Sequence, residues 1–346
     1  MPRYRRYVLF AFALLVLALL LMPAPVSTRR GAALMDLSHA PLFALVTLVA
    51  FYSLPPVLRS KQSLLAVGVA VIFTGGALEF VQELTGRSAN WYDFQANVLG
   101  VSSAALFAWA RETAAPRRRL ALGCTAAATM VLASIPSSVT LWDCWRQTRD
   151  LPLIASFEDQ LEMSRWRFNH ARAERSPRHA TAGRFSLRVE LSAHQYPGIY
   201  MLWTPNDWLR FASNGRDAKG PVELVFDLWL AEGPPLDVVV KVVDLYHTYR
   251  VKNDCYEEPV QLTPGPNRIR ISLDEIARAP RTRRMDLSHV RLLQFYVDSL
   301  DRPRTLYVDN IHLEGGQAVE ARRAYNSLSC GQVWPRGCLA KLDTTR

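Results

Sequence analysis

The chain has 346 residues, more than one compact core usually supports, so we expect two structural units. Apolar residues dominate up to about residue 141, and charged residues and prolines become frequent after it. The net charge of +10 is spread over arginines that flank apolar segments or scatter through the second half, and no nucleic-acid motif accompanies them. These features argue against a nucleic-acid partner.

Five apolar segments each approach the length of about 20 residues that a helix needs to cross a bilayer. They are residues 7–22, 40–58, 63–84, 94–110 and 120–141. The first follows three arginines, as in a signal peptide, but no small-residue cleavage site follows it in MPAPVSTRR. We therefore predict an uncleaved first span, and an α-helical transmembrane bundle over residues 1–141.

Basic residues predict the orientation, because Lys and Arg concentrate in cytoplasmic loops. With a cytoplasmic N-terminus, the cytoplasmic segments hold Arg3, Arg5, Arg6, Arg59, Lys61, Arg111, Arg117, Arg118 and Arg119, and the opposite loops hold Arg29, Arg30 and Arg87. Five crossings then leave the C-terminal half outside. We predict a multi-pass protein of the cytoplasmic membrane whose C-terminal domain is extracytoplasmic.

Polar residues interrupt the apolar segments near their predicted outer ends. They are Asp36, His39, Glu79, Gln82, Arg87, Asp93 and Asn97. Spacings of three or four residues put each pair on one helix face, and Gly75, Gly76 and Gly100 allow the helices to approach closely. Because polar side chains are costly in a membrane, this cluster predicts a binding site.

The pattern Asp36-x-x-His39, Glu79-x-x-Gln82, Arg87, Asp93-x-x-x-Asn97 and Gly100 resembles the VanZ-like membrane protein family over about residues 30–110. The resemblance implies a helical membrane domain. The chain has Leu37 where many members of that family have a lysine after the aspartate. The resemblance supplies a site and implies no particular reaction.

Several roles remain open for this cluster. Glu79 and Asp93 suit a proton donor and acceptor pair with His39 as partner if the protein is an enzyme, or helix caps and ion pairs with Arg87 if it is not. A guanidinium at Arg87 also suits an anionic headgroup. His39 is expected to hydrogen-bond to a carboxylate; a metal-ligand role is the weaker alternative.

The second half alternates apolar and polar residues with the period of two that is typical of half-buried strands. The segments are 185–191, 198–203, 222–230, 237–245, 267–273, 290–297 and 305–313. Turn-forming sequences separate them. We predict a linker at 142–155, an all-β sandwich of the jelly roll type at 156–316 and a tail at 317–346.

In three short sequence motifs, this half resembles carbohydrate-binding modules, also called galactose-binding-like domains. The motifs are Phe157-Glu158-Asp159, a Pro-Gly-x-Asn turn before Arg268, and LYVDNIHL at 306–313. The resemblance implies aromatic side chains that stack on sugar rings, with core packing as the alternative. The candidates are Trp203, Trp208, Tyr246, His247 and Tyr249.

No cofactor is predicted, although a structural Ca²⁺ at Glu158 and Asp309 is conceivable if the first and last strands pair. Four cysteines lie on the predicted outer side, where disulfides form. We expect Cys330 to pair with Cys338, because the residues between them turn readily, and Cys144 to pair with Cys255. Cys124 lies in an apolar span and is expected to stay a thiol.

The favoured hypothesis is a non-enzymatic protein of the bacterial cell envelope. Its partners would be membrane lipid and an envelope glycan or lipid-linked saccharide. The alternatives are an intramembrane enzyme that uses Glu79, Asp93 and His39, and a scaffold in which the cluster only holds helices together. No serine-protease order, glycine-rich phosphate loop or metal motif favours the enzyme.

Overall fold

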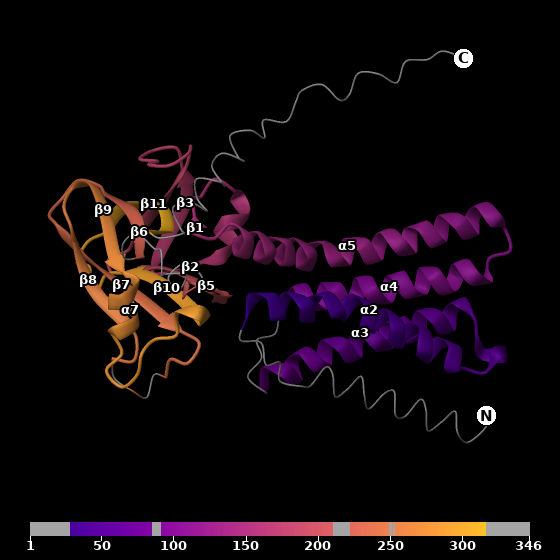
Figure 1. Ribbon diagram of the computed structural model, residues 1–346. Coiled ribbons are helices and arrows are strands. Elements are labelled where there is room, and N and C mark those ends of the chain that lie inside the picture. The colour runs from indigo at the N-terminus through magenta and orange to yellow at the C-terminus, as the bar shows by residue number, and fades with distance from the viewer. Residues whose placement is uncertain (1–27, 85–90, 210–221, 249–250, 252, 316–346) are drawn as a thin grey trace, which may run out of the picture. The chain divides into compact units, whose positions relative to one another are not determined.

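The computed structural model describes residues 28–84, 91–209, 222–248, 251 and 253–315, except for the side chains of residues 79–84 and 203–206. The chain divides into two compact units, Met1–Trp142 and Asp143–Arg346. The described part of the first unit is helical, and that of the second is mainly β-sheet (Figure 1). This agrees with the predicted helical half followed by a β-sandwich.

The helical unit contains four long helices and one 3₁₀ turn in its described part. They are α2 (Arg29–Ser53), η1 (Pro56–Leu58), α3 (Lys61–Leu84), α4 (Trp91–Glu112) and α5 (Pro116–Arg149). Helices α3, α4 and α5 cover the predicted apolar segments 63–84, 94–110 and 120–141, whereas α2 ends at Ser53 and the end of segment 40–58 forms η1. The first segment, 7–22, lies outside the described residues. Three stretches are long and apolar enough to span a membrane: α2, Lys61–Leu78 of α3, and α5.

Glycines allow α2 to pack closely against α3 and α4. A Cβ added at Gly100 of α4 would lie 2.9 Å from the Cα of Ala40 in α2. A Cβ at Gly75 of α3 would lie 2.5 Å from the ring of Phe43 in α2. At Gly100 the neighbour is backbone, so this position requires glycine, whereas an added Cβ at Gly75 would require the ring of Phe43 to shift. Both glycines lie at helix contacts, as the sequence predicted.

The end of α5 belongs to the second unit. Asp143 accepts hydrogen bonds from Arg165, at 2.7 Å from Nη2 and 3.1–3.2 Å from Nε, and both side chains are buried. Arg146 forms an ion pair with Asp159. The residues predicted as a linker, 142–155, are therefore the last turns of α5 and a first short strand, because paired charges hold this helix end on the β-sandwich.

In the described part of the second unit, eleven strands form two antiparallel sheets. They are β1 (Leu153–Ala155), β2 (Trp166–Asn169), β3 (Ala171–Ser176), β4 (Ser186–Leu191), β5 (Gly198–Asn206), β6 (Glu223–Leu230), β7 (Leu236–Asp244), β8 (Tyr256–Leu262), β9 (Gly265–Ser272), β10 (Val290–Tyr296) and β11 (Arg304–Glu314). The predicted strands correspond to β4 to β7 and β9 to β11. Strands β1, β2, β3 and β8 were not predicted, because they are short or carry exposed charges and a proline.

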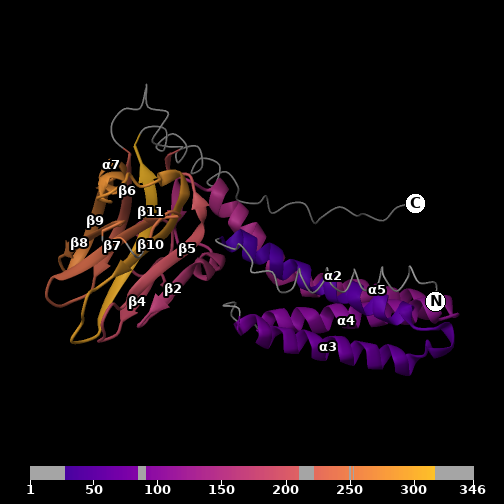
Figure 2. The ribbon, with the colours of Figure 1, turned by 90° about the horizontal axis from the view of Figure 1, so that it is seen from below.

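One sheet has the order β3-β4-β11-β6-β9, with β1 also paired to β11, and the other has the order β2-β5-β10-β7-β8 (Figure 2). Renumbering β4 to β11 as one to eight turns the central strands into 1-8-3-6 and 2-7-4-5. This is the strand order of a jelly roll, as predicted. Helix α7 (Leu273–Arg278) and the 3₁₀ turns η2 (Gln160–Arg165) and η3 (Leu287–His289) lie between strands.

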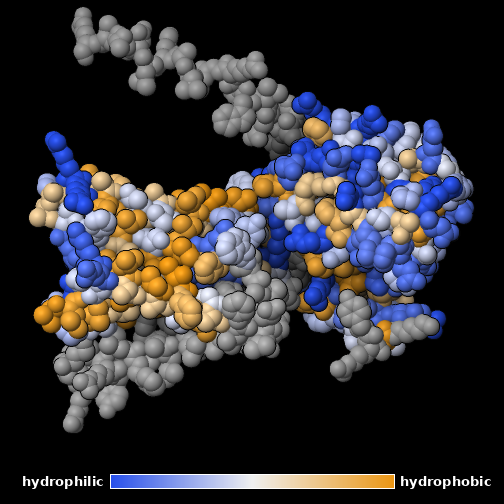
Figure 3. All heavy atoms as spheres, turned by 180° about the vertical axis from the view of Figure 1, so that it is seen from behind, coloured by the Kyte–Doolittle hydropathy of each residue, from blue (hydrophilic) through white to orange (hydrophobic). Residues whose placement is uncertain are grey.

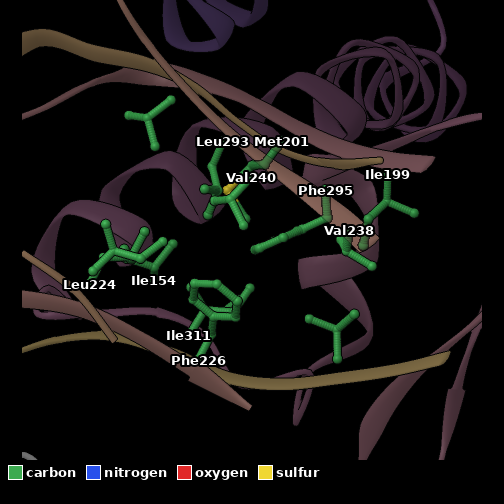
Figure 4. Packing of buried hydrophobic residues seen from close by; sticks show 14 of the residues in the cluster. Ile154, Ile199, Met201, Leu224, Phe226, Val238, Val240, Leu293, Phe295 and Ile311 are labelled. Atoms are coloured by element: carbon green, nitrogen blue, oxygen red, sulfur yellow. The ribbon is translucent and has the colours of Figure 1, made fainter. Parts of the chain in front are cut away.

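Side chains from both sheets interdigitate in one core. Figure 4 shows Leu224, Phe226 and Ile311 of one sheet facing Met201 and Phe295 of the other. The ring of Phe226 meets that of Phe295 at a centroid distance of 4.9 Å in an edge-to-face arrangement. Because successive side chains of a strand point to opposite faces, burying these residues places their neighbours on the outside.

Gly198 of β5 lies opposite Tyr296 of β10. A Cβ at Gly198 would lie 2.6 Å from the Cβ of Tyr296 and would overlap the carbonyl oxygen of Phe295. We predict that Gly198→Ala lowers the free energy of unfolding by about 1–3 kcal/mol, the usual cost of overpacking. Thermal unfolding of the full-length protein in detergent, followed by tryptophan fluorescence, measures this loss.

The control for this substitution is Gly265→Ala. Gly265 has a φ of +100° but no heavy atom within 4 Å of an added Cβ, so only backbone strain of about 1 kcal/mol is expected. An equal loss in the two variants would contradict the close approach of β5 and β10.

Candidate functional site

The outer face of the five-stranded sheet carries a continuous row of polar and aromatic side chains. Strand register places Arg167 of β2 beside Tyr200 of β5, Tyr200 beside Gln294 of β10, Gln294 beside Lys241 of β7, and Lys241 beside Glu257 of β8. All five side chains are at least partly exposed. With strands about 4.8 Å apart, the row extends over about 19 Å.

A second row lies next to the first. It contains Asn169 of β2, Gly198 of β5, Tyr296 of β10 and Val239 of β7. Because Gly198 has no side chain, β5 contributes no side chain next to Tyr296 on this face. We call the surface formed by Tyr200, Tyr296, Arg167, Gln294, Lys241 and Glu257 the tyrosine face.

A third tyrosine stands at the edge of this face. Tyr196 lies just before β5, is 54% exposed, and has a positive φ of 55°. Its ring meets that of Tyr296 at a centroid distance of 6.0 Å and an angle of 63°. The Asn169 side chain donates to its carbonyl oxygen at 2.7 Å. These contacts hold the Tyr196 ring in place beside Tyr296.

Glu257 organises the other end of the face. Its Oε1 accepts hydrogen bonds from Lys241 Nζ at 2.8 Å and from the Tyr296 hydroxyl at 2.7 Å. Its Oε2 accepts a weaker bond from the thiol of Cys255 at 3.7 Å. One carboxylate thus fixes an ammonium group and a phenol on neighbouring strands.

These contacts change the acidity of the groups. Partial burial raises the pKa of Glu257, but the hydrogen bonds from Lys241 and Tyr296 outweigh it, so the pKa lies below its usual value. Burial, and then the bond to Glu257, raises the pKa of the Tyr296 phenol. Burial likewise raises the pKa of Cys255 to about 11. At neutral pH Glu257 is therefore ionised and the Tyr296 hydroxyl is protonated.

The aromatic residues predicted as sugar contacts differ in how far they are buried. Trp208 is fully buried in the core, so this prediction is wrong: its ring fills the sandwich interior. Tyr246 is 60% exposed, at an edge-to-face distance of 6.1 Å from His289. His247 is largely buried and donates to the carbonyl of Asp254 at 2.9 Å. Tyr249 and the Trp203 side chain lie outside the described residues.

The sequence analysis missed Tyr196, Tyr200 and Tyr296. The signal for Tyr200 and Tyr296 was present in GIYMLW and LLQFYV, where each tyrosine alternates with buried apolar residues. Alternation alone does not reveal that β5 and β10 are neighbours, since almost one hundred residues separate them in the sequence. Their common face becomes evident only from the sheet order.

The helical unit brings together part of its predicted polar cluster. His39 of α2 donates from Nδ1 to Asn97 Oδ1 of α4 at 3.2 Å, and both side chains are buried. Asp93, one turn before Asn97, is buried too, whereas Asp36 is half-buried. The Nδ2 of Asn97 has no hydrogen-bond partner within the described part of the chain.

The rest of that cluster is not described. Glu79 and Gln82 lie in α3, but their side chains, like the whole of Arg87, are outside the described residues. Their roles in acid–base chemistry or headgroup binding stay predictions.

The two carboxylates considered for Ca²⁺ hold a loop. Strand β1 pairs with β11, as that prediction required. Glu158 accepts from the backbone N–H groups of Arg184 and Phe185, both at 2.7 Å, and Asp309 accepts from Thr181 at 2.6 Å and Ala182 at 3.0 Å. Burial raises the pKa of Asp309, and these N–H bonds partly offset the rise.

Oxygens that face N–H donors fit a cation poorly. Nowhere in the described ranges do three or more His, Cys, Asp or Glu side chains gather in a way that suits a metal ion. Loop anchoring therefore accounts for Glu158 and Asp309, and a structural Ca²⁺ stays an untested prediction.

The cysteines give no disulfide in the described residues. Cys255 carries a free thiol, so the structure does not contain the predicted Cys144–Cys255 bridge. The physical reason is that Cys255 packs into the hydrophobic core of the sandwich, a cluster that does not include Cys144. Cys124 lies in α5 as an exposed thiol. Cys330 and Cys338 lie outside the described residues.

Comparisons with known proteins identify no family. No family model matches the chain, and no curated protein matches it either, so the VanZ-like resemblance stays a prediction. Solved structures do match. An exo-β-agarase is 18% identical with a TM-score of 0.37, over 47% of this chain and 25% of that chain.

Two carbohydrate-binding modules from Clostridium thermocellum also match. A family 11 module in complex with a β-1,3-1,4-mixed-linked tetrasaccharide is 13% identical with a TM-score of 0.34, over 47% of this chain and 95% of the module. A family 30 module of a cellulosomal cellulase is 19% identical with a TM-score of 0.30, over 41% of this chain and 81% of the module. This chain spans about a quarter of the agarase.

We predict that Glu257→Gln lowers the pKa of the Tyr296 phenol toward its ordinary value, because the charge that disfavours the phenolate is removed. A spectrophotometric titration of the full-length protein checks this, since one more tyrosine should ionise at moderately alkaline pH. Glu190→Gln, on the other sheet, is the control and should leave the curve unchanged. Identical curves for Glu257→Gln and the native protein would contradict the proposed hydrogen bond.

Proposed function

We propose that the protein is a membrane-anchored, non-enzymatic glycan-binding protein whose sandwich binds an oligosaccharide on the tyrosine face. The observation that carries the proposal is the partly exposed row from Arg167 to Glu257 together with the rings of Tyr200 and Tyr196. The Tyr296 ring, which is only 9% exposed, packs edge-to-face against Tyr196. Tyrosine rings offer an apolar face to the carbon-bound hydrogens of a sugar ring, and the hydroxyl at their tip remains available for a polar partner.

Polar groups beside the rings supply the hydrogen bonds that sugar hydroxyls need. Gln294 offers both an amide donor and an acceptor, and Lys241 retains N–H donors beyond its bond to Glu257. Because Glu257 fixes Lys241 and Tyr296 in advance, little side-chain freedom is lost on binding. Such preorganisation favours affinity on an open, shallow surface.

Apolar helices supply the membrane anchor in this proposal. Figure 3 shows that much of the described surface of the helical unit is hydrophobic, whereas that of the sandwich is mainly hydrophilic. The charge pattern of the loops favours a cytoplasmic N-terminus and an extracytoplasmic sandwich. A glycan of the cell envelope or a lipid-linked saccharide is then the ligand within reach.

The polar cluster of the helical unit supports a second contact, with the headgroup of a membrane lipid or lipid-borne saccharide. The supporting observation is the buried Asn97 amide nitrogen, which lacks a partner among the described residues. An unpaired buried donor is costly, and an oxygen of a ligand would satisfy it.

The test compares two exposed tyrosines in the full-length protein in detergent. Titration against a panel of neutral β-glucans, agarose oligosaccharides and envelope polysaccharides should show saturable binding of at least one glycan. Tyr200→Ala should weaken that binding at least about tenfold, the factor that corresponds to 1.4 kcal/mol. Loss of one stacking ring accounts for an effect of that size.

Tyr246→Ala is the matched control, because Tyr246 is exposed but is not part of the tyrosine face. It should leave affinity unchanged. Loss of binding with Tyr246→Ala but not with Tyr200→Ala would move the site to the loop that carries Tyr246. Absence of binding to every glycan would contradict the proposed function.

A further inference from the structure

Among the described residues, none covers one apolar side of helix α3. Its buried side holds Leu64, Val71 and Gly75, which face α2 and α4. The opposite side holds Leu65, Val69 and Phe73, which are 70%, 59% and 78% exposed. Apolar residues at this helical spacing mark a face that packs against another apolar surface.

This side forms a shallow groove rather than a smooth ridge. Two adjoining depressions share Val69 and Phe73, one lined by Gln62, Leu65, Ala66, Val69, Ala70 and Phe73, the other by Val69, Ile72, Phe73, Gly76, Ala77 and Phe94. We call them together the α3 groove. Its small residues, Ala66, Ala70, Gly76 and Ala77, are of the kind that lets another helix approach closely.

We propose that residues 7–22 of this chain form a helix that occupies the α3 groove. This segment, YVLFAFALLVLALLLM, carries no charge and is rich in Leu and Phe side chains that suit a groove lined by small residues. As a helix it is about 24 Å long, and the groove from Gln62 to Ala77 is about 23 Å long. The two lengths therefore match.

The connection to α2 permits this placement. Phe43 lies against Gly75, and Phe51 packs with Leu64, so α2 and α3 are antiparallel. At a rise of 1.5 Å per residue, this register places Thr28 about 17 Å beyond Ala77 along the helix axis. With about 9 Å between helix axes, the distance to bridge is about 19 Å. The six Cα steps from Met22 to Thr28 span about 20 Å when extended. Pro23 and Pro25 favour extended backbone in this stretch.

Direction and charge agree with the same placement. A segment that runs toward the start of α2 runs parallel to α3. Its leading residues Arg3, Arg5 and Arg6 then lie at the same end as Lys61, the first residue of α3. Lys and Arg concentrate on the cytoplasmic side of a membrane. The proposed placement puts these basic residues on the same side, as that rule requires.

Cysteine cross-linking in membranes tests the proposal. The full-length protein, with all five native cysteines replaced by alanine, receives Val69→Cys together with Ala13→Cys, Leu14→Cys, Leu15→Cys or Val16→Cys, one pair at a time. Four consecutive positions cover a complete helical turn. We expect one pair to form an intramolecular disulfide as the dominant oxidation product, identified by mass spectrometry of the linked peptides.

A control series combines the same four positions with Val131→Cys, an exposed residue of α5, and should give little or no linkage. Disulfide-linked dimers in place of intramolecular links would make a second copy the occupant and overturn the proposal. Failure of all four Val69 pairs would assign the groove to lipid. Absence of residues 1–22 from the mature protein would overturn it as well.

Discussion

The alternation of side chains along β5 and β10 is the constraint on which the candidate site depends. Burial of Ile199 and Met201 on one strand, and of Leu293 and Phe295 on the other, fixes which neighbours point outward. A slip of one residue would bury Tyr200 and Gln294 and expose the core. Folding therefore assembles the tyrosine face, because the same register that buries the core residues directs its side chains outward.

Charge pairs determine much of the remaining geometry. The buried Asp143–Arg165 pair holds the end of α5 to η2, and Glu257 holds Lys241 and Tyr296 on adjacent strands. Asp143 and Glu257 each accept from defined donors, which offsets the desolvation of their charges. The loop from Thr181 to Phe185 is fixed in the same way by Glu158 and Asp309.

Local patterns predicted the long helices and seven of the strands, but not which strands become neighbours. Apolar length predicted α2 to α5, and period two predicted seven strands, because burial of a helix or strand face leaves a direct trace in the sequence. The polar residues of α2 and α4 were expected to share one cluster, and His39 and Asn97 are hydrogen-bonded; the carboxylate expected as partner of His39 stays a prediction. Strand β8 was missed because YEEPVQL is an edge strand with exposed charges and Pro259, so only its first and last residues are buried.

The site itself required tertiary information. Trp208 was a reasonable candidate by residue type, yet it is fully buried, whereas Tyr200 and Tyr296 were inconspicuous until β5 and β10 became neighbours. Residue type predicts what a side chain is able to bind, and burial decides whether it is accessible. The linker prediction failed for a related reason: its proposed residues find partners in the sandwich that are distant in sequence.

The most direct test of the account is fluorine NMR of the full-length protein labelled with fluorotyrosine, titrated with a bound glycan. Signals would be assigned by single Tyr→Phe substitutions. The account predicts saturable shifts of the Tyr196, Tyr200 and Tyr296 signals while the Tyr246 signal stays in place. Shifts at Tyr246 alone, or at Tyr307 on the opposite sheet, would contradict the assignment of the tyrosine face as the ligand surface.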